Sequence, residues 1–346
     1  MPEIIKEIAN NPQLIYMRIL AVTNMYPTPL APVSGIFVEQ QIKSLKQIGL
    51  DIGVMCVDRA QKGILAYVGL GRKVRASMTE FQPDVIHVMY GGVMANEVTR
   101  SIGDKPTVVS FCGSDLLGEH LSGPFRKLIA GYGVLASHMA AKRAAGIVVK
   151  SKNLHDALPP HIDRSKVRII PNGVDLERFK PLNRNECRDK LGWDSKYFHV
   201  LFPTNCGDPC KRFDLAQAAV EKMRYCGIST EIHQLRGVPH REVPVWINGS
   251  DVLLLTSLHE GSPNVVKEAL ACDLPVVSVD VGDVRERIQN IEGCYIAAAD
   301  PSDLADKLSL VYFGRKRIES RNRMQEVSLE RIAFKLRNLY QQLSER

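Results

Sequence analysis

Two glutamates, Glu260 and Glu268, stand eight positions apart in the stretch SLHEGSPNVVKE. A carboxylate accepts hydrogen bonds from hydroxyl groups, often from two neighbours at once, so this pair is suited to hold a sugar. Between them, Ser262 is a favoured N-cap and Pro263 a favoured first helical residue. The free amides of such a helix start, with the helix dipole behind them, form a site for an anion such as a diphosphate. The alternative is a plain turn, in which Glu260 complements the dipole and Glu268 faces solvent.

Basic and glycine residues elsewhere suit the same ligand. Lys211 and Arg212 follow a strand in the stretch GDPCKRFDLAQAA and are able to neutralise a leaving diphosphate. Gly35, in SGIFVEQQ, lies on a loop that enters a helix, and Gly261 lets the backbone approach a ligand closely. Taken singly, each of these also fits an ordinary loop or a solvated helix start.

Two further turns follow apolar runs. FCGSDLLG, residues 111–118, ends a strand in a Gly-Ser-Asp turn, and VGDVRE, residues 281–286, carries Glu286 beyond a glycine turn. Either is an ordinary connection if it stands alone. The eight cysteines are scattered, with no second close pair or His-x3-His to complete a zinc site, which favours reduced thiols. We expect no metal and no cofactor.

The elements that position these residues repeat twice. Short apolar runs alternate with helical patterns, first in RILAVTN, DIGVMCV, PDVIHVM, PTVVSFC and GIVVKS, then in YFHVLFPT, STEIHQL, DVLLLTS, PVVSV and CYIAA. Strands that are apolar throughout and separated by helices predict parallel sheets covered on both faces. We place the junction near residues 167–182, and the last thirty residues are strongly helical. Two such units facing each other bind ligands in the cleft at the carboxyl ends of their strands.

The length, composition and charge of the chain indicate how many domains it has and which kinds of partner it can bind. A chain of 346 residues predicts two domains, and no apolar run approaches the ~20 residues of a membrane-spanning helix. We see no signal peptide and expect residues 1–16 to be a short extension. The first 175 residues hold 20 basic and 14 acidic side chains, against 25 and 24 in the rest. This excess suits an anionic membrane or an acidic substrate; aromatic content of 6% argues against nucleic acid.

Together these residues resemble the retaining family-4 glycosyltransferases of the GT-B fold. The resemblance spans residues 17–340 and is carried most specifically by IIPNGVDLERFKP and by SLHEGSPNVVKEALACDLPVVSVDVGDVRE, which holds the family's Glu-x7-Glu element. It implies two Rossmann-like α/β/α domains, with an acceptor domain at 17–172, a donor domain at 173–325, and a C-terminal helix, 326–346, that returns to the first domain.

The resemblance also implies residue roles. Glu260 would contact the transferred sugar, Glu268 the ribose hydroxyls, and Lys211 the phosphates, with Arg212 beside it. We therefore predict Glu260, Lys211 and Arg212 as catalytic residues. The predicted donor-binding residues are Gly35, Cys112, Asn205, Gly261, Ser262, Pro263, Asn264, Val265 and Glu268.

Three positions depart from the family pattern. Thr204 and Asn205 stand where a Gly-Arg pair is usual, Cys112 replaces a common His, and Asp273 replaces a Gly. Arg212 would supply the missing charge, whereas Cys112 leaves the identity of the sugar open. FCGSDLLG and PCKRFDLA are similar to stretches in bacterial transferases of the teichuronic-acid type.

The function implied is retaining transfer of a hexosyl unit from a UDP- or GDP-sugar to a hydroxyl of a glycan or lipid-linked acceptor in envelope polysaccharide synthesis. We expect a cytoplasmic protein. Residues 123–146 mix apolar and basic side chains, which fits either contact with an anionic membrane or a plain buried helix.

Three other functions compete with this one. They are another GT-B enzyme, such as a sugar-nucleotide epimerase or a hexose-phosphate-utilising synthase, a non-catalytic nucleotide-sugar binder, and a pyridine-nucleotide oxidoreductase. The last would need Gly-x-Gly-x-x-Gly after the first strand, where the chain reads NMYPTPLAPVSG.

Overall fold

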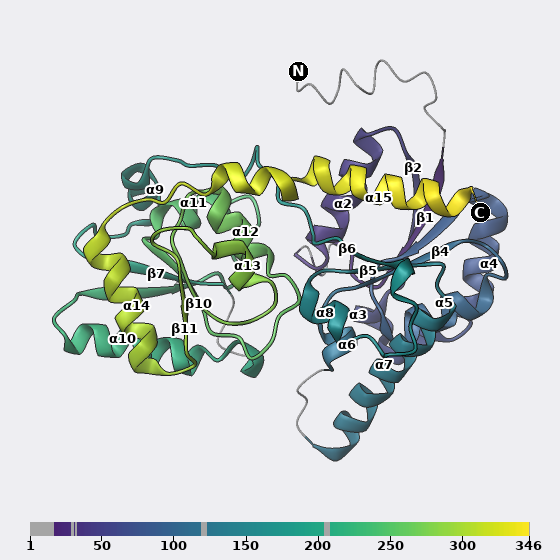
Figure 1. Ribbon diagram of the computed structural model, residues 1–346, viewed down its shortest axis with the longest axis horizontal. Coiled ribbons are helices and arrows are strands. Elements are labelled where there is room, and N and C mark those ends of the chain that lie inside the picture. Colours follow the sequence, from purple (N-terminus) through teal and green to yellow (C-terminus); the bar gives the residue numbers. More distant parts are fainter. Residues whose placement is uncertain (1–16, 29–30, 32, 119–122, 204–207, 346) are drawn as a thin grey trace.

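The computed structural model describes residues 17–28, 31, 33–118, 123–203 and 208–345, which form two α/β units side by side (Figure 1). The predicted extension, 1–16, and the predicted donor-binding residue Asn205 lie outside these ranges. The two facing parallel α/β units predicted from the sequence are confirmed.

The N-terminal unit is built on a parallel sheet of six strands in the order β2-β1-β3-β4-β5-β6. The strands are β1 Arg18–Thr23, β2 Asp51–Cys56, β3 Val85–Val88, β4 Thr107–Phe111, β5 Gly146–Val149 and β6 Val167–Ile169. The helices are α2 Ile36–Gln47, α3 Arg59–Lys62, η1 Gly63–Tyr67, α4 Leu70–Phe81, α5 Gly92–Ser101, α6 Ser114–Leu117, α7 Pro124–Arg143, α8 Lys152–Asp156 and η2 Arg164–Lys166. The central strands β3, β4 and β5 are buried along their whole length, as expected for a sheet covered on both faces.

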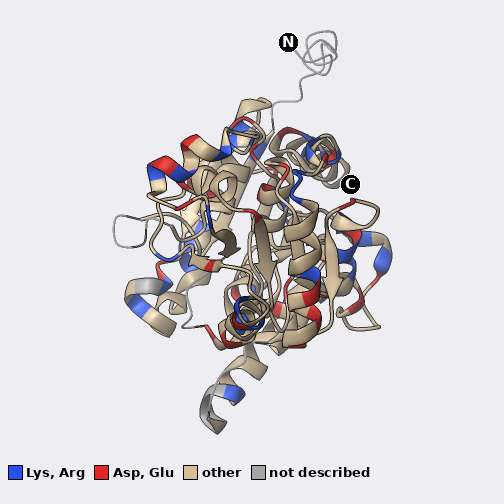
Figure 2. Cartoon of the chain, turned by 90° about the vertical axis from the view of Figure 1, so that its left-hand side faces the viewer, with Lys and Arg blue, Asp and Glu red and all other residues tan. Residues whose placement is uncertain are grey.

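The C-terminal unit repeats the plan with five parallel strands in the order β11-β10-β9-β7-β8. These are β7 Phe198–Phe202, β8 Thr230–Gln234, β9 Val252–Leu255, β10 Val276–Val279 and β11 Tyr295–Ala297. The helices are α9 Arg184–Leu191, η3 Pro209–Lys211, α10 Phe213–Tyr225, α11 Val243–Gly249, α12 Asn264–Ala271, α13 Val284–Ile288, α14 Pro301–Gly314 and η4 Arg321–Val327, and they are followed by the last helix, α15 Leu329–Ser344. Basic and acidic side chains are interspersed over this unit, in agreement with its nearly balanced charge (Figure 2).

Two segments connect the units, one near residue 174 and one near residue 328, and they lie side by side. Val174 donates its amide to the carbonyl of Val327 (2.9 Å), and Leu329 donates its amide to the carbonyl of Val174 (3.0 Å). A Cβ on Gly173 would lie 2.7 Å from the Cα of Leu329, so this position requires glycine. After this crossing, α15 lies along the N-terminal unit, as predicted (Figure 1). Tyr340 of α15 is fully buried, and its hydroxyl oxygen lies 2.6 Å from Nδ1 of His87 on β3.

The stretch near residues 167–182, predicted as the junction, begins with the short strand β6 on the edge of the N-terminal sheet and continues into the C-terminal unit, whose core includes Val174 and Leu176. The alternative of a plain buried helix at 123–146 is wrong for residues 127–135 of α7, where Leu128 is 71% and Leu135 54% exposed. Within the described ranges, every helix is too short or too polar to cross a membrane.

Candidate active site

A cavity of about 490 Å³ lies between the two units, at the carboxyl ends of their strands. The N-terminal unit supplies residues that follow β1, β3 and β4, and the C-terminal unit supplies η3 and the loop after β9. The lining residues are Met25, Phe37, Tyr90, Cys112, Gly113, Ser114, Asp208, Cys210, Lys211, His259, Glu260 and Gly261. The predicted cleft therefore exists, and four of the predicted residues line it: Cys112, Lys211, Glu260 and Gly261.

Glu260 and Lys211 meet at this cavity, although 49 positions separate them. The Lys211 ammonium lies 2.6 Å from Oε1 of Glu260, and Ser257 donates its hydroxyl to the same oxygen (2.8 Å). Thr256, directly after β9, donates its hydroxyl to the carbonyls of Lys211 (2.7 Å) and Arg212 (2.9 Å), which fixes the η3 turn against the sheet edge. The side chain of Glu260 is 15% exposed and that of Lys211 25%, so the pair is shielded but reachable from the cleft.

Arg212 is placed differently from Lys211. It adopts a left-handed conformation (φ 50°) directly before α10, and its Nε donates to the carbonyl of Thr256 (2.9 Å). The guanidinium is thus engaged with the backbone at the end of β9, and Arg212 is not among the described residues that line the cavity. Its geometry fits a residue that supports the η3 turn beside Lys211.

The corner between the glutamates begins its helix one residue later than expected. Helix α12 starts at Asn264, and Pro263, in extended conformation (φ −65°, ψ 120°), takes the N-cap position, so the assignment of Ser262 as N-cap is wrong. The Ser262 hydroxyl donates instead to Oδ2 of Asp283 (2.9 Å). The side-chain oxygen of Asn264, at the helix start, is buried and has no hydrogen-bond partner among the described residues. This orphaned acceptor and the first amides of α12, from Asn264 and Val265, fit a polar ligand.

Glu268 lies one turn into α12, with 15% of its side chain exposed. Its Oε1 is 3.8 Å from Nε2 of His240, whose Nδ1 lies 2.6 Å from a guanidinium nitrogen of Arg178. Arginine only donates, so Nδ1 of His240 is the acceptor and the proton sits on Nε2, facing Glu268. Sequence reasoning missed His240 and Arg178. The available signal was the position of GVPHRE just after β8, at the same sheet edge as the other loops.

Two buried lysines lie near the corner and were also missed. Lys267 is 1% exposed and donates to the Ser262 hydroxyl (2.9 Å), and burial lowers its pKa to about 8. Lys150 directly follows β5, next to Cys112 at the end of the paired strand β4, and is 2% exposed. Burial lowers the pKa of Lys150 as well. Lysine is almost never fully buried, so a sequence reading assigns both residues to the surface. The pattern of apolar residues therefore gave no indication that Lys267 and Lys150 lie inside.

The turn FCGSDLLG is organised by Asp115. Its buried carboxylate accepts the amides of Cys112 (3.0 Å), Gly113 (2.7 Å) and Gly91 (2.9 Å). Burial raises the pKa of Asp115, and these backbone hydrogen bonds oppose that rise. Burial also raises the pKa of the Cys112 thiol to about 12, so the thiol is neutral at pH 7. In VGDVRE, the engaged acid is Asp283, which binds Ser262, while Glu286 is exposed.

Glycine is required where backbone segments converge on the cleft. A Cβ on Gly261 would lie 2.1 Å from the carbonyl oxygen of Cys112, so the backbones of the two units are in close contact there. Gly35 precedes α2 with φ 66°, and a Cβ would lie 2.3 Å from the backbone of Met25, which lines the cavity. The predicted residue Gly35 therefore supports the loop after β1.

We expect Gly35→Ala to destabilise the protein and to weaken ligand binding in the cleft, because the loop after β1 must shift to admit the methyl group. Left-handed strain alone costs about 1–2 kcal/mol. Gly69→Ala is the matched control, since Gly69 has φ 67° with open space around its Cβ position. Chemical denaturation measures both variants. Equal losses in the two would contradict the clash with Met25.

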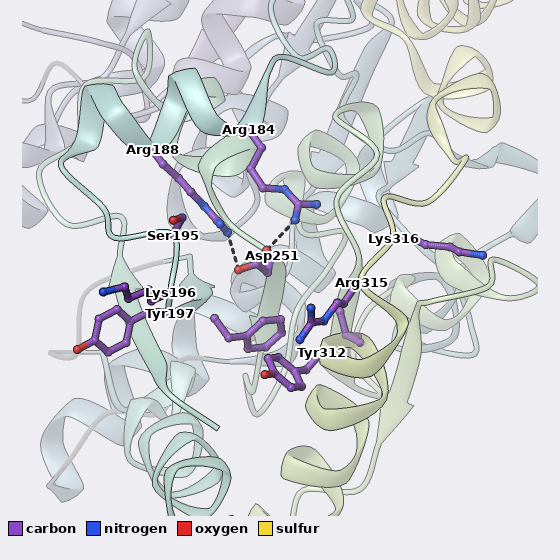
Figure 3. A pocket seen from close by; sticks show the side chains of 11 residues that line it. Arg184, Arg188, Ser195, Lys196, Tyr197, Asp251, Tyr312, Arg315 and Lys316 are labelled. Atoms are coloured by element: carbon purple, nitrogen blue, oxygen red, sulfur yellow. Dashed lines mark hydrogen bonds and ion pairs between the residues drawn. The ribbon is translucent and has the colours of Figure 1, made fainter. Parts of the chain in front are cut away.

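A second cavity, about 450 Å³, lies in the C-terminal unit near the amino ends of β7 and β9 (Figure 3). It is basic, with Arg184 and Arg188 both pointing at Asp251. This cavity is separate from the cleft, because it lies at the amino ends of the strands, whereas Glu260 follows the carboxyl end of β9. Its two arginines are already paired with Asp251.

Comparison with known proteins agrees with this geometry. A model described as Glycosyltransferase Family 4 matches residues 37–178, and one described as Glycosyl transferases group 1 matches residues 207–312. The chain is 24% identical to the putative teichuronic acid biosynthesis glycosyltransferase TuaC of Bacillus subtilis, covering 78% of this chain and 82% of the relative. It is 27% identical to a D-inositol 3-phosphate glycosyltransferase of Frankia alni, covering 60% and 54%.

Solved structures share the two-unit arrangement. Sucrose-phosphate synthase from Thermosynechococcus elongatus superposes with a TM-score of 0.76 at 16% identity, covering 94% of this chain and 99% of that one. Anabaena HepE in complex with UDP gives a TM-score of 0.69 at 16% identity, covering 94% and 100%. These likenesses establish the GT-B fold predicted from the sequence.

Proposed function

Because the chain belongs to the glycosyltransferases of the Family 4 and group 1 type, we propose that it transfers a hexosyl unit from a UDP- or GDP-sugar to an acceptor hydroxyl, with retention of configuration. The single observation that carries the proposal is the Lys211–Glu260 pair at the interdomain cavity, 2.6 Å apart. One cation and one carboxylate there match the two ends of a nucleotide sugar, a diphosphate and a set of hydroxyls. The likeness to TuaC supports a place in cell-envelope polysaccharide synthesis.

The donor would lie across the start of α12. Its diphosphate would accept hydrogen bonds from the amides of Asn264 and Val265 and face Lys211. Its ribose would reach Glu268 with His240 beside it, and its sugar would reach Glu260. The ammonium of Lys267, whose pKa burial lowers only to about 8, would add positive potential beneath the diphosphate. The Lys211–Glu260 pair would separate on binding, so that each side chain meets its part of the donor.

In the transfer step, the bond between the anomeric carbon and the diphosphate oxygen breaks and a bond to the acceptor oxygen forms. The acceptor proton passes to the departing diphosphate. The transition state resembles an oxocarbenium ion leaving a diphosphate, so catalysis requires stabilisation of the leaving charge more than a strong base. Lys211 and the α12 amides would supply it, with no metal or cofactor, and closure of the units would exclude water.

A panel of sugar nucleotides tests the proposal. One UDP- or GDP-sugar is expected to raise the unfolding free energy, by about 2.7 kcal/mol at 100 times its dissociation constant. Incubation with glycan acceptors should then give a product whose anomeric configuration matches the donor. Change of the sugar without an acceptor would indicate an epimerase, and binding without transfer across the panel would indicate a non-catalytic binder. No stabilisation by any donor would contradict nucleotide-sugar binding.

We further propose that the N-terminal unit contacts an anionic membrane carrying the acceptor. Helix α7 and the neighbouring η1 segment present an exposed apolar face, here called the α7 face: Ile64, Leu65, Val68, Leu128, Ile129, Tyr132 and Leu135. Ile64 is 75% and Leu128 71% exposed, and Lys62 and Lys127 are exposed beside them. Apolar side chains with adjacent lysines suit the boundary between acyl chains and anionic headgroups.

A small cavity links the α7 face to the cleft. About 140 Å³ in volume, it is lined by Ile64 and Ile129 of the α7 face and also by Tyr90 and Ser114. Tyr90 and Ser114 also line the interdomain cavity and lie 2.8 Å apart through their hydroxyls. A lipid-linked glycan anchored at the α7 face would therefore have a short path to the donor sugar, with the enzyme at the inner, cytoplasmic face of the membrane.

We expect the protein to sediment with vesicles containing phosphatidylglycerol at low salt and to be released in part at 1 M salt, where the Debye length falls to about 3 Å. Leu128→Glu combined with Ile64→Glu should abolish sedimentation. Phe313→Glu, which removes a 73%-exposed aromatic ring from the C-terminal unit, is the matched control and should leave it unchanged. Sedimentation of the double variant at the wild-type level would remove the α7 face from the proposal.

A further inference from the structure

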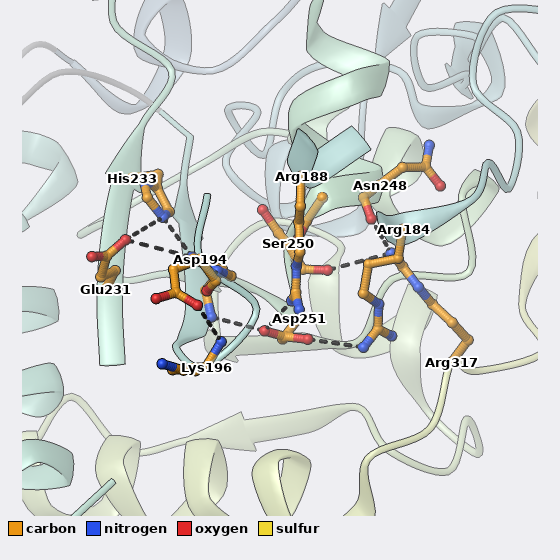
Figure 4. A network of polar contacts seen from close by, with 12 residues as sticks. Arg184, Arg188, Asp194, Lys196, Glu231, His233, Asn248, Ser250, Asp251 and Arg317 are labelled. Carbon is orange, nitrogen blue, oxygen red and sulfur yellow. Dashed lines mark hydrogen bonds and ion pairs between the residues drawn. The ribbon is translucent and has the colours of Figure 1, made fainter. Parts of the chain in front are cut away.

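Three potential metal ligands converge on one face of the C-terminal sheet. In the register of β7 and β8, His199 lies directly opposite Glu231, and His233 follows Glu231 by two residues. Side chains two apart on a strand point to the same face, so the three lie together. Figure 4 shows Glu231 and His233 directed toward the loop that carries Asp194. None of the three is among the described residues that line the cleft.

The distances fit one small ion. Nδ1 of His199 lies 2.9 Å from Nε2 of His233, and Oε2 of Glu231 lies 3.7 Å and 3.6 Å from these two nitrogens. Ligand atoms about 2.0–2.2 Å from a tetrahedral Zn²⁺ stand roughly 3.3 Å from one another. The three atoms therefore occupy one face of a coordination tetrahedron after adjustments of a few tenths of an ångström. Glu231 is 40% exposed, which leaves the fourth position open to water.

The surroundings orient both imidazoles for this role. Nε2 of His199 is 2.9 Å from the carbonyl oxygen of Asp194, so it carries the proton and Nδ1 presents its lone pair. The ring of Trp193 stacks on His233 at 3.7 Å and on His199 at 4.9 Å, which holds both rings in place.

We propose that His199, Glu231 and His233 bind a divalent transition metal, best matched by Zn²⁺, with water as the fourth ligand. Two imidazoles and one carboxylate suit Zn²⁺ and exclude Mg²⁺ and Ca²⁺, which favour all-oxygen sites. The ion would join the edge strand β8 to β7 and act as a structural clamp. It lies apart from the cleft and takes no part in the transfer step. The competing state is metal-free, with the Nε2 proton of His233 donated to Nδ1 of His199.

Cobalt is the probe that tests the site. The full chain, freed of metal with a chelator, is titrated with Co²⁺, whose visible d–d bands are intense in tetrahedral sites. One equivalent should produce these bands, Zn²⁺ should displace them, and Zn²⁺ should raise the melting temperature. His233→Gln and Glu231→Gln remove partly exposed ligands and are expected to fold. Each should weaken binding by more than the roughly 10–100-fold loss seen when only a supporting group is removed.

The control is His155→Gln, which removes a histidine that pairs with Asp156 alone among the described carboxylates. It should bind Co²⁺ and Zn²⁺ as the wild type does. Absence of the d–d bands together with no thermal effect of Zn²⁺ would overturn the proposal. So would wild-type affinity in His233→Gln, or an equal loss in His155→Gln.

Discussion

Replacing Glu260 with glutamine should lower the rate of sugar transfer by at least about 10²–10³-fold while the protein stays folded, as expected when a preorganised electrostatic contact is lost. The carboxylate has only Lys211 and Ser257 as side-chain partners among the described residues. Glutamine keeps one oxygen that accepts hydrogen bonds but removes the negative charge, so the sugar hydroxyls lose a charged acceptor and the Lys211 ammonium loses its counter-charge. Lys211→Ala should have a similar effect through the leaving diphosphate. Initial rates with the donor found by thermal stabilisation, together with circular dichroism, measure both.

The matched control is Glu286→Gln, which removes an exposed carboxylate from the neighbouring α13. It should transfer at the wild-type rate. The double variant of Glu260 and Lys211 should lose much less than the product of the two single losses, because the residues act as a unit. Wild-type turnover in either single variant would remove the pair from catalysis.

Asp251→Ala should lower the free energy of unfolding by about 3–5 kcal/mol, the loss typical when one partner of a buried ion pair is removed. Asp251 accepts from Arg188 (2.6 Å), from Arg184 (2.9 Å) and from the amide of His199 (2.8 Å). Arg188 is only 7% exposed, so its guanidinium would keep a charge with little water and no carboxylate (Figure 3). Urea denaturation followed by circular dichroism gives the difference.

Asp280→Ala provides the comparison for this variant. Asp280 lies 2.8 Å from Arg285, but the two side chains are 53% and 59% exposed, so the pair should contribute only about 0–1 kcal/mol. Similar losses in the two variants would show that burial of Arg188 does not govern the energetics of Asp251.

Much of the fold could be read from the sequence because the apolar runs are short, continuous and regularly separated. The predicted run YFHVLFPT gives β7, and the run DVLLLTS gives β9. The strand β6 was missed because three residues carry no usable periodicity. Helix α12 was displaced by one residue because the Ser262 hydroxyl, the expected cap, is engaged by Asp283, and that contact depends on tertiary structure.

The site was predictable only in part. Glu260 and Glu268 stand in one local motif, whereas the partners of that corner come from distant segments: Lys211, Asp283 and His240. No spacing rule connects them, and the family resemblance supplied Lys211 alone. The Arg212 side chain donates a hydrogen bond to the backbone carbonyl of Thr256. Its charge alone predicted a contact with the diphosphate, and no sequence pattern indicated this backbone contact.

The return of α15 has a consequence for how the protein is made. Ile332, Leu336, Leu339, Tyr340 and Leu343 complete a core whose other members come from β1, β2, β3, α2 and neighbouring segments. A ribosome synthesises those early segments first, and the whole C-terminal unit follows before α15 emerges. Until then His87 lacks its Tyr340 partner and this face of the first sheet stays uncovered. The N-terminal unit, first to be translated, is thus the last whose core can close.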